Sequence, residues 1–194
     1  GASHTGAGPG LYRDPAFQRS VRRLGALGLS FDAAVLHSQL ADVAALAAAC
    51  PHTAIVLCHS GAPTGYGRFR GQAEEVFRAW RQGLAALVAL PNVSIKLGGM
   101  TVRLAAYDYG GDRPMGSAAL APLWAPYLHT CVELFGPARC MLESNFPVDR
   151  FGATYVNLWN AFKRLAAKFS ADEKTALFSG TASRVYRVNL PANA

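Results

Sequence analysis

Residues 139–150, RCMLESNFPVDR, join a short apolar run to an abrupt polar ending. Residues 140–142 are Cys-Met-Leu, and Glu143, Ser144 and Asn145 follow directly before a Phe-Pro pair. A short apolar run bounded by polar and turn-forming residues is consistent with a buried strand, and in α/β proteins functional groups gather where such strands end. We therefore expect residues 139–144 to form a buried strand that leads into a functional site.

Three earlier stretches have the same strand character, and a helical pattern follows each of them. The expected strands are residues 29–37, 53–61, 93–97 and 139–144. The expected helices are residues 14–27, 39–50, 72–90, 117–135 and 153–168, with a last helical segment after Ser170. Asp14 before Pro15, and Ser170 three residues before Glu173, are typical helix N-terminal signals. Strands that alternate with helices predict a parallel sheet joined by right-handed crossovers.

Two architectures contain such a sheet, an open doubly wound α/β fold and a (β/α)8 barrel. Nucleotide-binding open sheets carry a glycine-rich phosphate loop after an early strand, and the sequence contains neither GxGxxG nor GxxxxGK[ST]. The barrel is therefore favoured. The chain has 194 residues, of which 51% are hydrophobic, and no shift in composition divides it. We expect residues 1–194 to form a single domain.

The charge, hydropathy and cysteine content indicate which partners and which cellular compartment are expected. The formal net charge is +7, but Lys and Arg are dispersed along the chain, so we expect a solvated basic surface and no nucleic-acid partner. No apolar run approaches the ~20 residues of a spanning helix, so no membrane partner is expected. The four cysteines lack CxxC pairing, which indicates reduced thiols and, by default, a cytoplasmic protein.

The carboxyl ends of the four expected strands carry an unusually polar set of side chains. His37 lies at the end of the first strand, His59 near the end of the second and Lys96 near the end of the third, while Glu143 and Asn145 lie at the end of the fourth. Because the carboxyl ends of parallel strands lie at one edge of the sheet, these side chains are expected to converge.

Strand alternation predicts which of these residues share a face. Lys96 lies opposite the apolar residues of its strand, so it is expected to point away from the helix layer into the barrel mouth. The same rule places His59 on the face of the apolar residues of its strand. Glu143 and Asn145 are expected to share a face, with Glu143 one layer beneath Asn145.

Several motifs together resemble a known family. Residues 56–67 read VLCHSGAPTGYG, residues 90–100 read LPNVSIKLGGM and residues 135–149 read FGPARCMLESNFPVD. In combination they resemble the carboxy-terminal part of the amidohydrolase-2 family. These are (β/α)8-barrel hydrolases of the amidohydrolase superfamily, a group that includes sugar lactonases and the 2-pyrone-4,6-dicarboxylate lactonase.

The resemblance implies a partial barrel of about the last four βα units. The first strand of such proteins carries a His-x-His pair that nothing here matches, and a complete barrel takes about 250 residues. We therefore expect a fragment that is inactive alone and that self-associates through exposed strand edges.

The resemblance also assigns roles around the opening stretch. The family's last-strand motif is Gly-Ser-Asp-Trp-Pro, whose Asp binds metal or acts as general base, and Asn145 occupies that position here. An amide accepts no proton at neutral pH and is a weak metal ligand, so Glu143 or Asp149 is expected to supply the carboxylate. Asp149 is expected on a loop that can swing over the barrel mouth. His59 matches the family histidine, a metal ligand or a polariser of the scissile carbonyl.

Cofactor and substrate expectations follow from the same residues. A divalent metal, zinc or manganese, is implied by the resemblance, but Asn145 favours a metal-independent or weakly metal-dependent mechanism. Lys96 either pairs with Glu143 in the interior or clamps an anionic group of the substrate. His37 either contacts substrate or makes structural hydrogen bonds. Three loop arginines are expected to meet an anionic small-molecule substrate: Arg68, Arg70 and Arg103.

The resulting hypothesis is a hydrolase that attacks a lactone or related carbonyl with activated water. Glu143 or Asp149 would be the base, and His59 and Lys96 would stabilise the oxyanion. Two alternatives remain open: a decarboxylase of the same superfamily and a half-barrel with a structural role and no catalysis.

Overall fold

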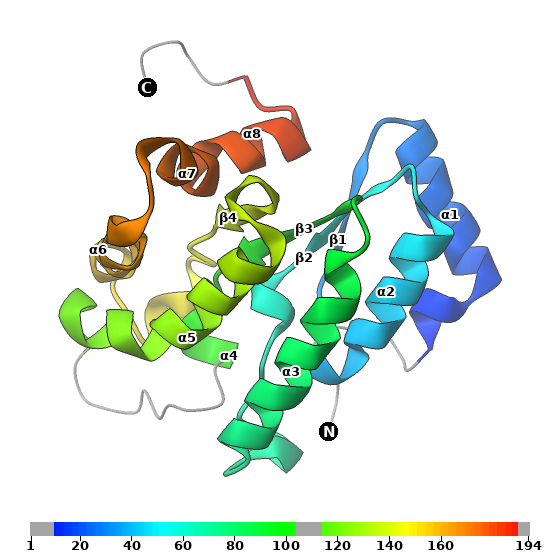
Figure 1. The fold of residues 1–194 in the computed structure, drawn as a ribbon. Helices are drawn as coiled ribbons and strands as arrows, with labels where there is room; N and C mark the ends of the chain where they lie inside the picture. The colour runs from blue at the N-terminus through cyan, green and yellow to red at the C-terminus, as the bar shows by residue number, and fades with distance from the viewer. Residues whose placement is uncertain (1–9, 104–113, 190–194) are drawn as a thin grey trace.

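The structure of the chain, a computed structural model, describes residues 10–103 and 114–189. Its centre is a parallel sheet with strand order β1-β2-β3-β4. The strands are β1 (Ser30–Ala33), β2 (Ala54–Leu57), β3 (Val93–Leu97) and β4 (Cys140–Leu142). Figure 1 shows the strands side by side, with helices packed around them. The predicted alternation of parallel strands and helices is confirmed.

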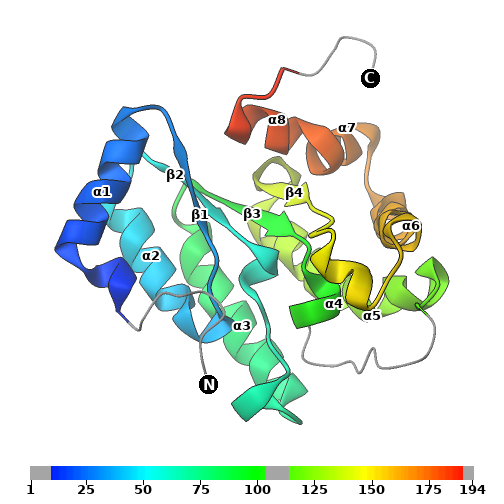
Figure 2. The ribbon, with the colours of Figure 1, turned by 180° about the vertical axis from the view of Figure 1, so that it is seen from behind.

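Helices cover one face of the sheet, and the opposite face carries polar side chains. The helices are α1 (Pro15–Ala26), α2 (Leu40–Ala49), α3 (Ala73–Val88), α4 (Met100–Arg103), α5 (Ser117–Phe135), α6 (Tyr155–Leu165), α7 (Ala171–Thr175) and α8 (Thr181–Tyr186). In Figure 1, α2, α3 and α5 lie in front of the sheet; in Figure 2 the opposite face is turned to the viewer, with α7 and α8 above it. On this opposite face the side chains of Asp32 and Lys96 are partly exposed, whereas Val56 and Met141 are buried.

The two faces of the sheet differ in chemistry because side chains alternate along each strand. On the helix-covered face, Ile55, Leu57, Ile95 and Leu97 are fully buried in the main hydrophobic core. In β3 the intervening residue Lys96 is only partly buried. The predicted orientation of Lys96, away from the apolar residues of its strand, is confirmed.

Side-chain caps fix the starts of several helices. The Asp14 carboxylate accepts the Phe17 N–H at 2.8 Å at the start of α1. Ser170 and Glu173 exchange side-chain-to-backbone hydrogen bonds before α7. Such caps satisfy N–H groups that have no partner inside the helix. Both predicted caps are confirmed, whereas the helix expected from residue 153 begins at Tyr155 after the cap Thr154.

The turns at the amino ends of the strands are short and tightly bonded. Asn92 precedes β3, and its side-chain Nδ2 donates to the carbonyls of Ala47, Cys50 and Thr53 at 3.0–3.1 Å. One amide therefore ties the end of α2 to the starts of β2 and β3. These turns lie at the end of the sheet away from the polar cluster.

Three strands are shorter than predicted: β4 spans only Cys140–Leu142 of the expected stretch 139–144, and the differences at the first two strands matter for the site. The stretch 29–37 is strand only from Ser30 to Ala33, and His37 begins a short 3-10 turn. The stretch 53–61 leaves the sheet at Leu57, because His59, Ser60, Gly61 and Ala62 all have positive φ, between 45° and 71°. The short helix α4 follows β3 after Gly98 and Gly99 and was not expected from the sequence.

Two compositional expectations can be compared with the structure. All four cysteines are free and buried. Within residues 10–103 and 114–189, no helix is both long and apolar enough to cross a membrane.

Candidate active site

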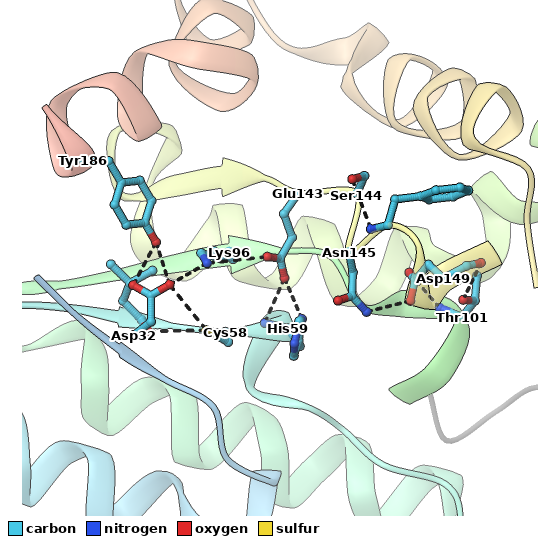
Figure 3. Close-up of polar contacts among 12 residues, drawn as sticks. Asp32, Cys58, His59, Lys96, Thr101, Glu143, Ser144, Asn145, Asp149 and Tyr186 are labelled. Carbon is cyan, nitrogen blue, oxygen red and sulfur yellow. Dashed lines mark hydrogen bonds and ion pairs between the residues drawn. The ribbon is translucent and has the colours of Figure 1, made fainter. Parts of the chain in front are cut away.

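A line of polar contacts crosses the face of the sheet that carries Lys96 (Figure 3). The Tyr186 hydroxyl of α8 lies 2.9 Å from both carboxylate oxygens of Asp32 in β1. Lys96 Nζ in β3 donates to Asp32 Oδ2 at 2.6 Å and lies 3.8 Å from Glu143 Oε2. His59 Nδ1–H donates to Glu143 Oε1 at 2.7 Å. Five side chains that are far apart in the sequence thus form one connected cluster.

The contact between Glu143 and His59 defines the chemistry of the cluster. A carboxylate only accepts hydrogen bonds, so His59 Nδ1 donates the proton of this contact, and in the neutral imidazole the lone pair is then on Nε2. The His59 backbone N–H donates to the same Glu143 oxygen at 3.2 Å, which fixes the imidazole relative to the carboxylate. A histidine held in this way by a carboxylate is suited to accept a proton at Nε2.

Strand alternation gave the wrong face for His59. It predicted that His59 lies with the apolar residues of β2, but the backbone reverses after Leu57 into the left-handed segment 59–62. Such φ values are sparsely populated by residues other than glycine. The buried Trp80 of α3 donates its indole N–H to the Ser60 carbonyl at 2.6 Å and so holds the turn.

Two glycines after β3 make room for the Glu143–His59 contact. A Cβ on Gly98 would lie 2.1 Å from Glu143 Cγ and 2.4 Å from the Glu143 carbonyl oxygen. A Cβ on Gly99, whose φ is +66°, would lie 2.8 Å from both Cγ and Nδ1 of His59. Any larger residue at either position would displace one partner of the contact.

Lys96 is held as a cation by two carboxylates. Burial acts to lower the pKa of Lys96, but the hydrogen bond to Asp32 and the nearby Tyr186 and Glu143 outweigh it, so the pKa lies above its usual value. The predicted pairing with Glu143 is present at 3.8 Å, yet Asp32 at 2.6 Å is the closer partner. Burial raises the pKa of the adjacent Cys58 thiol to about 12, so this thiol stays neutral at physiological pH.

Asn145 and Asp149 form a second polar group beside the cluster (Figure 3). Asn145, with φ +50°, donates its Nδ2–H to Asp149 Oδ1 at 2.9 Å, and the Thr101 N–H donates to Asp149 Oδ2 at 3.4 Å. Asp149 has an exposed fraction of 0%. The expectation of a mobile Asp149 over the barrel mouth is therefore wrong. Burial raises the pKa of Asp149, opposed by the hydrogen bonds from Asn145 and Thr101.

The remaining predicted residues lie away from this cluster. His37 is buried; its Nδ1 lies 3.3 Å from the Ala62 carbonyl and 3.4 Å from the Thr64 N–H, which is the structural alternative of the two considered. Arg68 and Arg70 are exposed, and Arg68 packs over the Phe69 ring. The side chain of Arg103 is outside the part that the structure describes.

Sequence reasoning missed Asp32, Tyr186, Gly98 and Thr101. Asp32 carried a usable signal, since a lone acid inside an apolar strand needs a cationic or hydrogen-bonding partner. Tyr186 carried none, because the contact between α8 and β1 depends on how distant parts of the chain pack.

A divalent metal would need a group of ligands among these same residues. In the described part of the chain, no three His, Cys, Asp or Glu side chains are grouped so that they could hold a metal ion. His59 Nδ1 is committed to Glu143 and Asn145 donates to Asp149. These residues do not by themselves fit a divalent metal.

The carboxylate–histidine pair lies at the carboxyl edge of the parallel sheet, which is where α/β proteins place their active sites. The amidohydrolase family model matches residues 2–188, and the chain belongs to that family. The resemblance inferred from the motifs is therefore confirmed.

Relatives with names or structures agree with this assignment. The chain is 32% identical over 182 residues to an L-fucono-1,5-lactonase of Burkholderia multivorans, covering 93% of this chain and 59% of the relative. It is 31% identical, with a TM-score of 0.81, to an amidohydrolase crystal structure from Burkholderia multivorans with bound HEPES, and covers 60% of it. A crystal form with bound zinc gives a TM-score of 0.80 at the same identity and coverage. The chain spans less than two thirds of each relative, which matches the predicted partial barrel.

Proposed function

We propose that this chain contributes the site of a hydrolase that opens a lactone ring by attack of water. The observation that carries the proposal is the 2.7 Å hydrogen bond from His59 Nδ1 to Glu143 Oε1 at the carboxyl edge of the sheet. The relative named L-fucono-1,5-lactonase supports a sugar lactone as the substrate class.

The geometry favours His59, held by Glu143, as the base. His59 Nε2 accepts a proton from water while the water oxygen bonds to the lactone carbonyl carbon. The tetrahedral oxyanion then collapses, the ring C–O bond breaks, and the imidazolium returns its proton to the leaving alkoxide, giving the hydroxy acid. Lys96, whose charge is paired with Asp32 and Glu143, balances the negative charge of Glu143 beside the reacting groups. This differs from the sequence-based hypothesis, in which Glu143 or Asp149 was the base and His59 stabilised the oxyanion.

The charge of the cluster favours an uncharged lactone over the anionic substrate expected from the sequence. Lys96 is flanked by Asp32 and Glu143, so its charge is already compensated. Arg68 and Arg70 are exposed, and neither contacts the described cluster. A carboxylate on the substrate would therefore find no uncompensated cation among the described residues of the cluster.

The test measures acid release from a panel of neutral sugar 1,5-lactones and from a lactone dicarboxylate. It is run on the 194-residue chain and on any longer product of the same reading frame. His59→Gln should reduce the enzymatic rate by roughly 10²–10⁴-fold. His52→Gln, at an exposed position outside the cluster, is the matched control and should retain the rate. Hydrolysis that survives His59→Gln, or a panel with no substrate, would contradict the proposal.

A further inference from the structure

Asp32 and Tyr186 have no part in the mechanism above, yet they form one end of the polar cluster. Asp32 lies in β1, and its side chain has a relative exposure of 37%. Tyr186 is the last residue of α8 and reaches Asp32 across a separation of 154 residues. Tyr186 and Lys96 also contact each other directly, because Lys96 Nζ lies 5.5 Å from the centre of the Tyr186 ring.

We propose that Asp32 and Tyr186 are positioning residues that hold the Lys96 ammonium beside Glu143 without letting it bond to Glu143 closely. The relevance of this role to catalysis rests on the proposed function. The positioning itself stands on the geometry of the cluster.

The distances indicate that the two carboxylates, Asp32 and Glu143, have different hydrogen-bond partners. Lys96 Nζ is 2.6 Å from Asp32 and 3.8 Å from Glu143, so the direct charge-assisted hydrogen bond goes to Asp32. Glu143 uses Oε1 for both N–H groups of His59 and turns Oε2 toward Lys96. If the ammonium bonded Glu143 directly, it would compete with the imidazole for the carboxylate. Asp32 therefore keeps Glu143 available for His59.

Tyr186 supports this arrangement through its contacts with Asp32 and Lys96. Its hydroxyl lies 2.9 Å from both oxygens of Asp32 and donates its proton to this carboxylate, which limits the carboxylate's rotation. The aromatic ring also offers its face to the ammonium, which favours the cation. The titratable groups around Lys96 are thus Asp32, Glu143, Tyr186 and the buried Cys58 thiol.

The experiment follows Lys96 directly, without turnover. Lysine is labelled with ¹³C at Cε, the Lys96 signal is assigned with Lys96→Met, and its pH titration is recorded by NMR. Asp32→Asn keeps the shape of the side chain and removes its charge, so the Lys96 pKa should fall by about 1–3 units. Tyr186→Phe removes only the hydroxyl and should lower it by less. Tyr155→Phe, at a 51% exposed tyrosine, is the matched control and should change nothing.

A second readout distinguishes positioning from a general structural role. With Asp32→Asn, Lys96 loses its close partner and should move to Glu143, so the Lys96–Glu143 coupling measured by a double-mutant cycle should increase. The His59 ring ¹⁵N shifts should then show a weakened Nδ1–H contact. An unchanged Lys96 titration and coupling in Asp32→Asn would overturn the inference. Failure of the proposed function would instead appear as absent lactone hydrolysis with the lysine response intact.

Discussion

Gly98 is the residue that makes the position of Glu143 possible. A Cβ at Gly98 would approach Glu143 Cγ to 2.1 Å, so Gly98→Ala must push Glu143 away from His59. We expect this change to cost about 1–3 kcal/mol in the free energy of unfolding and to abolish hydrolysis.

Thermal unfolding and the lactone assay would measure both effects of Gly98→Ala. Gly116→Ala is the matched control, because nothing lies within 4 Å of the added methyl group and φ at Gly116 is −72°. Its cost should stay within about 1 kcal/mol, since Gly116 precedes α5 as its cap. Equal losses for the two variants would show that the close approach to Glu143 is unimportant.

Asn145 donates a hydrogen bond to a carboxylate that is fully buried. Asn145→Asp would put two carboxylates in contact, with Asp149 at 0% exposure, and should cost about 1–3 kcal/mol in the absence of metal. Because a cation relieves this repulsion, added Zn²⁺ should stabilise the variant more than the unmodified chain.

The comparison for Asn145→Asp is Asn145→Gly, which removes the amide, adds no charge and tolerates the φ of +50°. Melting temperatures with EDTA and with Zn²⁺ would be measured for all three proteins, together with their zinc content. A zinc response no larger in Asn145→Asp than in Asn145→Gly would argue against a carboxylate–metal role at this position.

His37 makes the stability of the chain depend on pH. Burial lowers its pKa below the usual 6.5, so the unfolded chain takes up a proton at His37 before the folded chain does. The contribution of His37 is present above pH 6.5 and is lost as the pH falls toward the folded pKa. His37→Gln should therefore flatten the decline in unfolding free energy on this acid side, as measured by urea unfolding. Burial also lowers the pKa of His129, but this residue is present in both proteins and so contributes equally to both. The same slope of unfolding free energy against pH in the unmodified chain and in His37→Gln would contradict the prediction.

At the scale of elements, α3 supports the left-handed turn through a single indole. Trp80→Phe would leave the Ser60 carbonyl without its 2.6 Å hydrogen bond and should cost about 1–3 kcal/mol beyond the loss of ring volume. Trp159→Phe is a matched control, because the Trp159 indole N–H is buried but has no hydrogen-bond partner within the described structure. Urea unfolding of the two variants gives the comparison. A cost for Trp159→Phe as large as that for Trp80→Phe would contradict the assigned role of Trp80.

The elements themselves could be predicted well because each depends on local signals. β3 matched its predicted bounds, and α5 ran from Ser117 to Phe135 as expected. Periodicity also gave the correct face for Lys96. These features follow from residue spacing alone.

The site was harder to predict because it lies where regular structure ends. His59 lies after Leu57 in a left-handed turn, so the two-residue period no longer applied to it. Asp149 was expected to be mobile, and its burial depends on packing against α4 and on hydrogen bonds from Thr101 and Asn145. Contacts of this kind follow from tertiary packing and carry no local sequence signal.

On the scale of the whole molecule, the sheet has two outer strands. In the described part of the chain, β1 pairs only with β2, and β4 pairs only with β3. Unpaired strand edges favour association with another chain. We expect the 194-residue chain to self-associate with rising concentration, which light scattering after size exclusion would measure. A monomer at all concentrations would contradict this expectation.

Because the four strands are parallel, the loops that follow them lie at one end of the sheet and the turns that precede them lie at the other end. Connections after the strands carry His59, Gly98, Glu143 and Asn145, whereas the turns before them, such as that tied by Asn92, carry none of the cluster. Lengthening a surface connection costs little conformational entropy. A short peptide inserted after Gly136, in the turn between α5 and β4, should therefore leave the polar cluster intact. The same peptide inserted between Ala62 and Gly67 should disrupt the cluster, although both sites lie in loops.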